Sequence, residues 1–253
     1  MDKALYVGMT AAKHNMLAQA IRSNNLANAN TNGFRGDFEQ ARSMSVYYGE
    51  GLPTRAFAVT ENPASNFAPG PLNQTGRDLD VAIAGDGFIA VQNFNAEGVE
   101  GEAFTRSGNL SVDNAGLLRT GNGLPVLGNA GPITLPPFQK IEIAKDGTIS
   151  IVLQGSPPSE ITQLDRIRLV NPEPQALEKR TDGLMHLKDD EAVTDADINV
   201  NLTHGFLEGS NVNPIDEITR VISLARQYEM SVKVMETAKQ NSEASARLLQ
   251  TNG

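Results

Sequence analysis

Residues 213–250 constrain the fold more than any other stretch of this 253-residue chain, because they contain no glycine and, after Pro214, no proline. Asn213 can cap a helix by accepting a hydrogen bond from a free backbone N–H group, and Pro214 suits the first helical position. Asp216 and Glu217 place negative charge beside the positive end of the helix dipole. A helix over these residues would be about 55 Å long, which is too long to wrap around a compact domain.

Within this helix, apolar side chains recur at alternating steps of three and four residues, which is the pattern of a heptad seam. Lys239 and Ser242 interrupt the seam, and a seam of this kind needs a partner helix. The seam positions are Ile218, Val221, Ala225, Tyr228, Val232, Met235, Lys239, Ser242, Ala246 and Leu249. Further apolar side chains lie off the seam and are available to neighbouring molecules: Ile215, Ile222, Leu224, Val234 and Leu248.

A second amphipathic pattern opens the chain and predicts a helix from Asp2 to Asn28. The run Asn30-Thr31-Asn32-Gly33 ends it, since Gly33 can adopt the left-handed conformation. The economical interpretation is that the two terminal helices pair as a coiled-coil-like hairpin, with the rest of the chain inserted between them. The alternative is that each helix packs separately on the central domain. The positions expected to share one face of the first helix are Leu5, Met9, Ala12, Met16, Ala20 and Ile21.

The chain between the two helices changes character near residue 76. Prolines and glycines in 34–75 argue against helix, so we expect an extended connecting arm with short strands, packed along the helices or on a neighbouring molecule. In 76–205, short apolar runs separated by Asp-Gly and similar turns predict antiparallel hairpins, and the glycine pairs 85/87 and 121/123 are interpreted as hairpin turns.

The predicted fold class is therefore α+β. The N-terminal helix lies in residues 1–33 and the C-terminal helix in 206–253, and together they form a helical core domain. The connecting arm occupies 34–75, and an antiparallel β-rich outer domain occupies 76–205.

Composition excludes several classes of protein. The net charge is −9 and no basic stripe is visible, so we expect no nucleic-acid partner. No run reaches the roughly 18 apolar residues of a membrane span, so we expect no direct membrane insertion. The N-terminus lacks the pattern of a cleavable secretory signal. Cysteine is absent, which excludes disulfide and thiol chemistry.

Signals for catalysis are poor. The three histidines are scattered, without a spacing typical of metal ligands. The acidic stretch Asp189–Asp197 leads into a D-x-D-x-N series, but Val200 stands where a calcium loop needs glycine and Phe206 where it needs a bidentate glutamate. We therefore expect a solvated acidic loop, no catalytic, cofactor-binding or metal-binding residues, and no enzyme activity.

Two distant segments resemble the signature motifs of the axial proteins of the bacterial flagellum, the rod and hook family. NNLANANTNGFR (Asn24–Arg35) resembles the N-terminal signature, an N-N-L-A-N run followed by T-x-G-F and a basic residue. GFLEGSNVNPIDE (Gly205–Glu217) with ARQYEMSVK (Ala225–Lys233) resembles the C-terminal signature. The matching C-terminal positions are Leu207, Glu208, Ser210, Asn211, Val212, Glu217, Arg226, Tyr228, Glu229 and Lys233.

The resemblance extends between the signatures, where TGRDLDVAIAGDGFIAV and FTRSGNLSVDNAGLL resemble the central β motifs of the family. Lys239 departs from the pattern, since relatives commonly carry Asp there. The chain lacks room for the extra outer domain of a hook protein. Its opening, the GLPTR run Gly51–Arg55 and the stretch VNPEPQALEKRTDGLM favour a proximal rod member, with a distal rod member as the near alternative.

This resemblance implies a structural subunit of the flagellar rod, with the terminal helices in the inner layer of a helical tube and the β domain facing outward. It implies export in unfolded form through the flagellar type III apparatus, without signal cleavage, to the periplasmic rod of the basal body. The implied partners are copies of the chain itself, other proximal and distal rod proteins, the export apparatus and the surrounding ring proteins.

We expect the subunit interface to use both signatures and the helical seam, and helices that depend on burial to be marginal in the monomer. The alternative from another class is a secreted β-rich adhesin or carbohydrate-binding protein with a helical stalk. The expected interface residues are Asn24, Asn25, Leu26, Asn28, Thr31, Gly33, Phe34, Arg35, Glu208, Asn211, Ile218, Val221, Ile222, Arg226, Tyr228, Val232, Met235 and Leu249.

Overall fold

The computed structural model describes residues 3–39, 41–45, 56–60, 64–94, 100–157, 159–188 and 194–251. The chain divides into two compact units. The helical unit comprises residues 1–29, 36–66 and 212–253, and the β unit comprises residues 30–35 and 67–211. Several features of the sequence interpretation lie outside the described residues, namely Asp2, Gly51–Arg55, the acidic residues Asp189, Asp190 and Glu191, and the side chains of Leu248 and Leu249.

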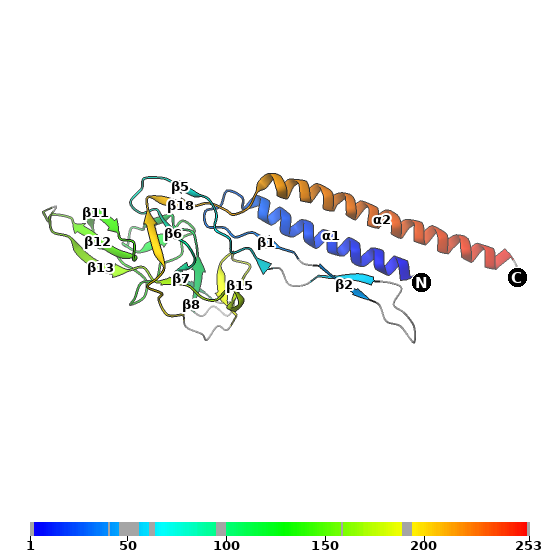
Figure 1. Ribbon diagram of the computed structural model, residues 1–253, viewed down its shortest axis with the longest axis horizontal. Coiled ribbons are helices and arrows are strands. Elements are labelled where there is room, and N and C mark those ends of the chain that lie inside the picture. Colours follow the sequence, from blue (N-terminus) through cyan, green and yellow to red (C-terminus); the bar gives the residue numbers. More distant parts are fainter. Residues whose placement is uncertain are drawn as a thin grey trace. The chain divides into compact units, whose positions relative to one another are not determined.

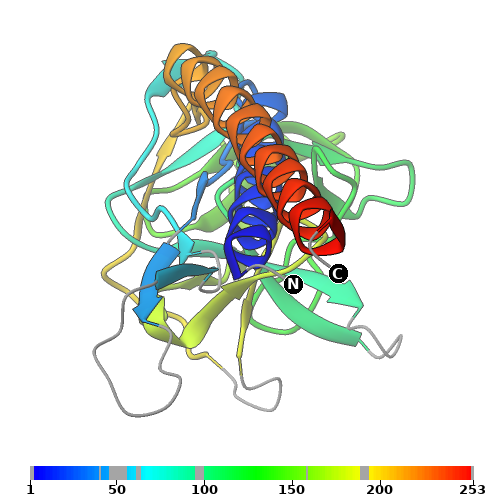
Figure 2. The same cartoon turned by 90° about the vertical axis from the view of Figure 1, so that its right-hand side faces the viewer.

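The helical unit is built on two long helices, α1 (Lys3–Ala27) and α2 (Pro214–Thr251), which run antiparallel and lie side by side (Figures 1 and 2). The predicted cap of α2 is confirmed, because the Asn213 side-chain oxygen accepts a hydrogen bond from the Ile215 N–H group at 3.1 Å. Gly33 adopts the expected left-handed conformation, with a φ of 70°, but α1 already ends at Ala27, before the Asn30–Gly33 run. With several antiparallel sheets elsewhere in the chain, the predicted α+β class is confirmed.

The predicted contact face of α1 was wrong in part. Met9 and Met16 are 51% and 64% exposed, and Ala20 is also exposed, whereas Ala12 is buried as expected. Small and polar side chains form the buried face instead. These residues are Gly8, Ala12, Asn15, Ala18, Arg22 and Asn25.

The predicted seam of α2 was wrong in part. Val221, Ala225 and Met235 are half-buried as expected, but Ile218, Tyr228 and Val232 are 46%, 39% and 39% exposed. Positions one residue before the predicted seam share the buried face, whose members are Glu217, Val221, Leu224, Ala225, Ser231, Met235 and Ala238. Periodicity locates apolar stripes, but it does not say which stripe faces the partner helix.

Close approach of the helices explains the small residues on α1. A Cβ atom at Gly8 would lie 2.7 Å from Cγ of Met235 and 3.6 Å from the Ser231 carbonyl oxygen. A larger side chain at this position would force Met235 to move. The contact between α1 and α2 therefore depends on a small residue at position 8 of α1 as much as on the burial of apolar side chains.

The segment expected to be a connecting arm contributes short strands to the helical unit. Strand β1 (Asp37–Phe38) pairs with β4 (Ala64–Ser65), and β2 (Ala41–Ser45) pairs with β3 (Ala56–Thr60), both antiparallel. Strand β3 also contacts α1. This part of the arm thus packs along a helix of the same chain (Figure 1).

The β unit contains one five-stranded sheet, one three-stranded sheet and several two-stranded pairs, all antiparallel. The five-stranded sheet has the order β14 (Leu169–Val170), β7 (Phe88–Phe94), β8 (Glu100–Thr105), β16 (Met185–Leu187) and β15 (Leu177–Lys179). The three-stranded sheet has the order β11 (Phe138–Ile143), β12 (Thr148–Leu153) and β13 (Thr162–Arg166). The pairs are β9 (Leu110–Val112) with β10 (Leu118–Thr120), β6 (Val81–Ala84) with β17 (Asn201–His204), and β5 (Leu72–Gln74) with β18 (Phe206–Glu208). A short 3₁₀ helix spans Pro174–Ala176.

The Asp-Gly turn at 146–147 joins β11 and β12 as predicted, and Ile143 pairs with Ile149 across it. Hydrogen bonds from the Thr148 hydroxyl and N–H groups to the Asp146 carboxylate lower the pKa of that carboxyl from its ordinary value. The prediction for Gly85 and Gly87 was wrong, because β6 pairs with β17 and not with β7. That turn is a corner between two sheets and not a hairpin.

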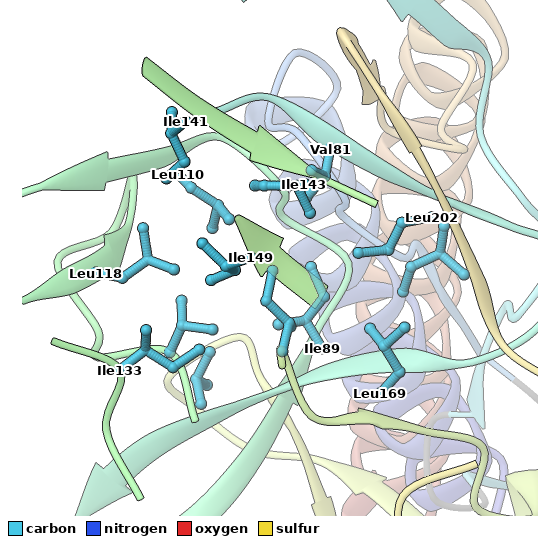
Figure 3. Packing of buried hydrophobic residues seen from close by; sticks show 14 of the residues in the cluster. Val81, Ile89, Leu110, Leu118, Ile133, Ile141, Ile143, Ile149, Leu169 and Leu202 are labelled. Carbon is cyan, nitrogen blue, oxygen red and sulfur yellow. The ribbon is translucent and has the colours of Figure 1, made fainter. Parts of the chain in front are cut away.

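The core of the β unit is one large cluster of aliphatic side chains contributed by strands from several sheets (Figure 3). Ile89 on β7, Leu110 on β9 and Ile149 on β12 are fully buried within it. A second, smaller cluster gathers around Phe88 and Phe104. The unit therefore has a hydrophobic core of its own.

Candidate functional site

The C-terminal signature residue Glu208 is the centre of a buried charge cluster in the β unit. Glu208 is 1% exposed, and its carboxylate accepts from Arg35 Nη1 at 2.7 Å and from Arg106 Nη1 at 3.0 Å. The Gly70 N–H group donates to the same carboxylate at 2.8 Å. Burial lowers the pKa of the Arg35 guanidinium, while the Glu208 charge opposes that shift. The cluster joins segments that are far apart in the sequence.

The end of the N-terminal signature is held tightly beside this cluster. The Gly33 N–H group donates to the Glu208 carbonyl oxygen at 2.8 Å. A Cβ atom at Gly33 would lie 2.3 Å from the Arg106 carbonyl carbon, and its positive φ is strained for other residues. The Lys179 ammonium lies 3.9 Å from the centre of the Phe34 ring and donates to the Arg35 carbonyl oxygen at 2.7 Å.

A second buried ionic group joins α1 to α2 within the helical unit. Arg22 Nη1 lies 3.1 Å from Oε1 of Glu217, and Asn25 donates to the same oxygen at 3.4 Å. The Asn25 amide also exchanges two hydrogen bonds of 2.9 Å with the backbone of Asp37, at the start of β1. The beginning of α2, the last turns of α1 and the first short strand are thereby fixed together.

The exposed apolar side chains gather on the two helices. α1 presents Tyr6, Met9, Met16 and Leu17 to solvent, and these residues lie off the face that meets α2. α2 presents a longer set, comprising Ile215, Ile218, Ile222, Tyr228, Met230, Val232 and Val234. Isolated exposed apolar residues are ordinary, but contiguous apolar stripes indicate an interaction surface.

Among the described residues, no cluster of three or more His, Cys, Asp or Glu side chains is arranged to hold a metal ion. Asp197 instead accepts hydrogen bonds from the backbone and side-chain amides of Asn199. In the same part of the chain, neither helix combines the length and hydropathy needed to span a bilayer. The features that stand out are thus two buried ionic groups and two apolar helix faces.

Family models cover both helices and part of the β unit. The model described as "Flagella basal body rod protein" matches residues 5–35, and "Flagellar basal body rod FlgEFG protein C-terminal" matches residues 203–248. The model described as "Flagellar hook protein FlgE/F/G D1 domain" matches residues 82–151. The two terminal matches contain the signature segments identified in the sequence.

Full-length relatives decide the family. The flagellar basal-body rod protein FlgF of Salmonella typhimurium is 40% identical, over 98% of this chain and 99% of its own length. This chain belongs to the flagellar basal-body rod protein family. FlgF of Escherichia coli is 38% identical over the same shares, and the rod protein FlgG of Buchnera aphidicola is 30% identical over 95% of this chain and 97% of its own length. The resemblance to the rod and hook family is confirmed.

Within this rod-family chain, several expected interface residues are buried by the chain's own residues. Asn25 is buried in the helical unit, and Phe34, Arg35 and Glu208 are buried in the β unit, each at 8% exposure or less. Asn211 donates to the Ala68 carbonyl oxygen at 2.9 Å. These signature residues organise the subunit from within.

The remaining expected residues lie at or near the surface, where described. Asn24, Thr31, Ile218, Ile222, Arg226, Tyr228 and Val232 are exposed, and Leu26, Asn28, Gly33, Val221 and Met235 are half-buried. Asn28 donates to the Asn24 carbonyl oxygen at 3.0 Å and so helps to end α1. Leu249 belongs to α2, but its side chain is not described.

Sequence reasoning missed three basic residues that complete these groups, Arg22, Arg106 and Lys179. Arg22 could have been noticed in the sequence. It lies four residues after Ala18 on the face of α1 that carries mostly small residues, and a charged residue there needs a counter-ion. Arg106 stands inside the motif FTRSGN, where its charge precedes a buried strand. Lys179 carried no signal, since its partners are backbone and ring atoms that are remote in sequence.

Proposed function

We propose that this chain is a structural subunit of the proximal flagellar rod that joins its neighbours through the exposed apolar faces of α1 and α2. The observation that carries this proposal is the concentration of exposed Ile, Met, Val and Tyr side chains on these two helices. Because the chain belongs to the rod family, we infer that this surface contacts other rod proteins in the basal body. Copies of the chain and the adjacent rod proteins are the partners.

The energetic scale of such a surface is sufficient for assembly. Fully burying an Ile, Val or Met side chain contributes about 1.5–3 kcal/mol. Ile222 is 50% exposed, so covering its remaining area contributes about 1 kcal/mol. A stripe of similar residues on each helix, repeated at every subunit contact, adds several such contributions. Introduction of one carboxylate into a covered stripe would oppose them by several kcal/mol.

The two helices act as one coiled-coil-like core, in which the α1 side of the contact is small and polar and the outer faces of both helices are apolar. Covering the outer faces adds to the stability of the pair, because helices depend on tertiary burial. Ordering of the helix ends is then coupled to joining the polymer. The residues expected at this surface are Ile218, Ile222, Tyr228 and Val232, with Arg226 beside them.

The remaining expectations follow from rod membership and are part of the same proposal. The subunit reaches the periplasmic rod through the flagellar type III export apparatus without a cleaved signal, and it lies near the surrounding ring proteins. It has no enzymatic activity. The higher full-length identity to the FlgF relatives than to the FlgG relative supports a proximal position over a distal one. Nothing in the described residues favours the adhesin alternative.

The decisive test is Ile222→Asp, compared with Ser223→Asp as a matched control. Both positions are exposed on α2, one residue apart, and both variants gain the same charge. We expect Ile222→Asp to leave the purified chain folded by circular dichroism but to abolish its incorporation into basal bodies and swimming. Ser223→Asp should retain both. Normal assembly and motility of Ile222→Asp would refute the proposal.

A further inference from the structure

The exposed methionines of the described residues all lie on the two long helices. Met9 and Met16 on α1 are 51% and 64% exposed, and Met230 on α2 is 59% exposed. The other methionine side chains that the structure describes are more covered, since Met185 is 4% exposed and Met235 is half-buried. In this part of the chain, strongly exposed methionine is therefore confined to the surface proposed for assembly.

The three methionines place sulfur on both helix faces. Met9 and Met16 lie seven residues apart, so they share one side of α1 and are separated by about 10.5 Å of helical rise. Met230 precedes Ser231, whose carbonyl oxygen would lie 3.6 Å from a Cβ atom at Gly8, the residue before Met9. Met9 and Met230 therefore lie at the same level of the helix pair, one on each helix.

The thioether sulfur is the atom on these faces that reacts with hydrogen peroxide. A sulfur lone pair attacks one peroxide oxygen, and the O–O bond breaks as the S–O bond forms. The second oxygen takes up the proton of the attacked oxygen and leaves as water, so sulfur loses two electrons and the peroxide gains them. The product, methionine sulfoxide, is polar and chiral. The aliphatic side chains of the same faces do not undergo this reaction.

We propose that Met9, Met16 and Met230 form an oxidative modification site, at which sulfoxide formation in the free subunit prevents it from joining its neighbours. The effect rests on the proposed assembly through the helix faces, where a sulfoxide places a polar oxygen without a partner in an apolar contact. Enzymatic reduction of the sulfoxide reverses the block. Subunits that have already joined are protected, because their neighbours cover the three side chains.

The first measurement follows oxidation by hydrogen peroxide with peptide mass spectrometry. In the purified full-length chain, the three methionines should react at least about tenfold faster than the buried Met185. In isolated basal bodies, the same three should react at least about tenfold more slowly than in the purified chain. Similar rates at the exposed and buried methionines, or equal rates before and after assembly, overturn the proposal.

The second measurement compares cells carrying the wild-type chain with cells carrying Met9→Leu/Met16→Leu/Met230→Leu, because leucine has a similar apolar volume and no sulfur. Each strain receives a brief hydrogen peroxide pulse, and new basal bodies are counted relative to an untreated culture of the same strain. This ratio removes basal effects of the substitutions and the effects of peroxide on other proteins. It should be at least about fivefold lower for the wild-type chain. Equal ratios overturn the proposal.

A third variant separates the polarity of the modified side chain from the chemistry of the pulse. Met9→Gln/Met16→Gln/Met230→Gln introduces polar side chains of similar length, and glutamine and leucine are both good helix formers. Its incorporation into basal bodies should be at least about tenfold below that of the triple leucine variant. Equal incorporation of the two variants, at any level, overturns the proposal. Normal assembly of Ile222→Asp instead refutes assembly through the helix faces, whereas its failure together with equal peroxide ratios refutes only the control by oxidation.

Discussion

The buried pair of Arg22 with Glu217 should be a major determinant of how α2 is held on α1. Glu217→Ala would leave the Arg22 guanidinium, whose side chain is 11% exposed, without its counter-ion. Removing one partner of a buried ion pair costs about 3–5 kcal/mol. The residual exposure places the expected loss at the lower end, about 3 kcal/mol. The Asn25 amide also loses an acceptor, although at 3.4 Å this bond is weak.

The adjacent residue supplies the control. Asp216 pairs with Arg220 on the same helix, but both side chains are about half exposed, so Asp216→Ala should cost about 0.5 kcal/mol beyond its helix-dipole contribution. Both residues lie in the first turn of α2, and the dipole contribution is therefore common to both variants. The difference between the variants, about 2–3 kcal/mol, isolates the buried pair.

Urea unfolding followed by circular dichroism at 222 nm measures this difference, because both long helices belong to the helical unit. The double variant Arg22→Ala/Glu217→Ala should lose less stability than the sum of the single variants, with a coupling energy of about 2 kcal/mol. Equal midpoints for Glu217→Ala and Asp216→Ala, or a coupling energy near zero, would refute a role for the buried pair in holding the helices together.

Three further predictions concern the β unit, and hydrogen exchange of its amides measures each. Ile149→Ala should destabilise the unit by about 3 kcal/mol because the side chain is fully buried, whereas Ile161→Ala, at an exposed position, should cost less than about 0.5 kcal/mol. Gly33→Ala should cost at least about 1 kcal/mol for its left-handed backbone, and more for the collision of its Cβ atom. The pKa of Asp146 is lowered in the folded state, so its contribution is present above the unfolded pKa of about 4 and is lost as the pH falls through the folded value. Asp146→Asn should flatten the stability profile in that acidic window, and an unchanged profile would contradict it.

The parts of the fold that the sequence predicted are those specified by neighbouring residues. Asn213 caps α2 and Asn28 helps to end α1 because each bonds with backbone groups within four residues. The hairpin at Asp146–Gly147 follows from the same local chemistry. Local hydrogen bonds and backbone conformation are determined by residues within a short stretch of sequence, so they can be predicted from it.

Features set by long-range contact were not predictable in this way. The hydrogen bond of Arg22 with Glu217 joins residues 195 positions apart, and it draws a charged residue to a face where periodicity predicted Ile218. Gly85 and Gly87 carry ordinary turn chemistry, but whether such a turn makes a hairpin depends on which strand β6 pairs with.

The signature motifs were correct for the family but ambiguous for the role of each residue. Motif resemblance identified Asn25, Arg35 and Glu208 and suggested contacts between subunits. The structure shows that these side chains bond with residues of their own chain. A signature can thus mark the internal organisation of a subunit, while the assembly surface is formed by less distinctive apolar residues such as Ile222.

The proposal that α2 joins neighbouring subunits is tested most directly by cross-linking in assembled basal bodies. The chain has no cysteine, so a single Ile222→Cys variant reports on one position of the helix, and Ile198→Cys reports on an exposed position of the β unit. With a short thiol-to-amine cross-linker, rod assembly through the helices predicts strong products with neighbouring rod proteins from position 222 and few from position 198. The reverse result, with products from position 198 and none from position 222 in intact rods, would contradict it.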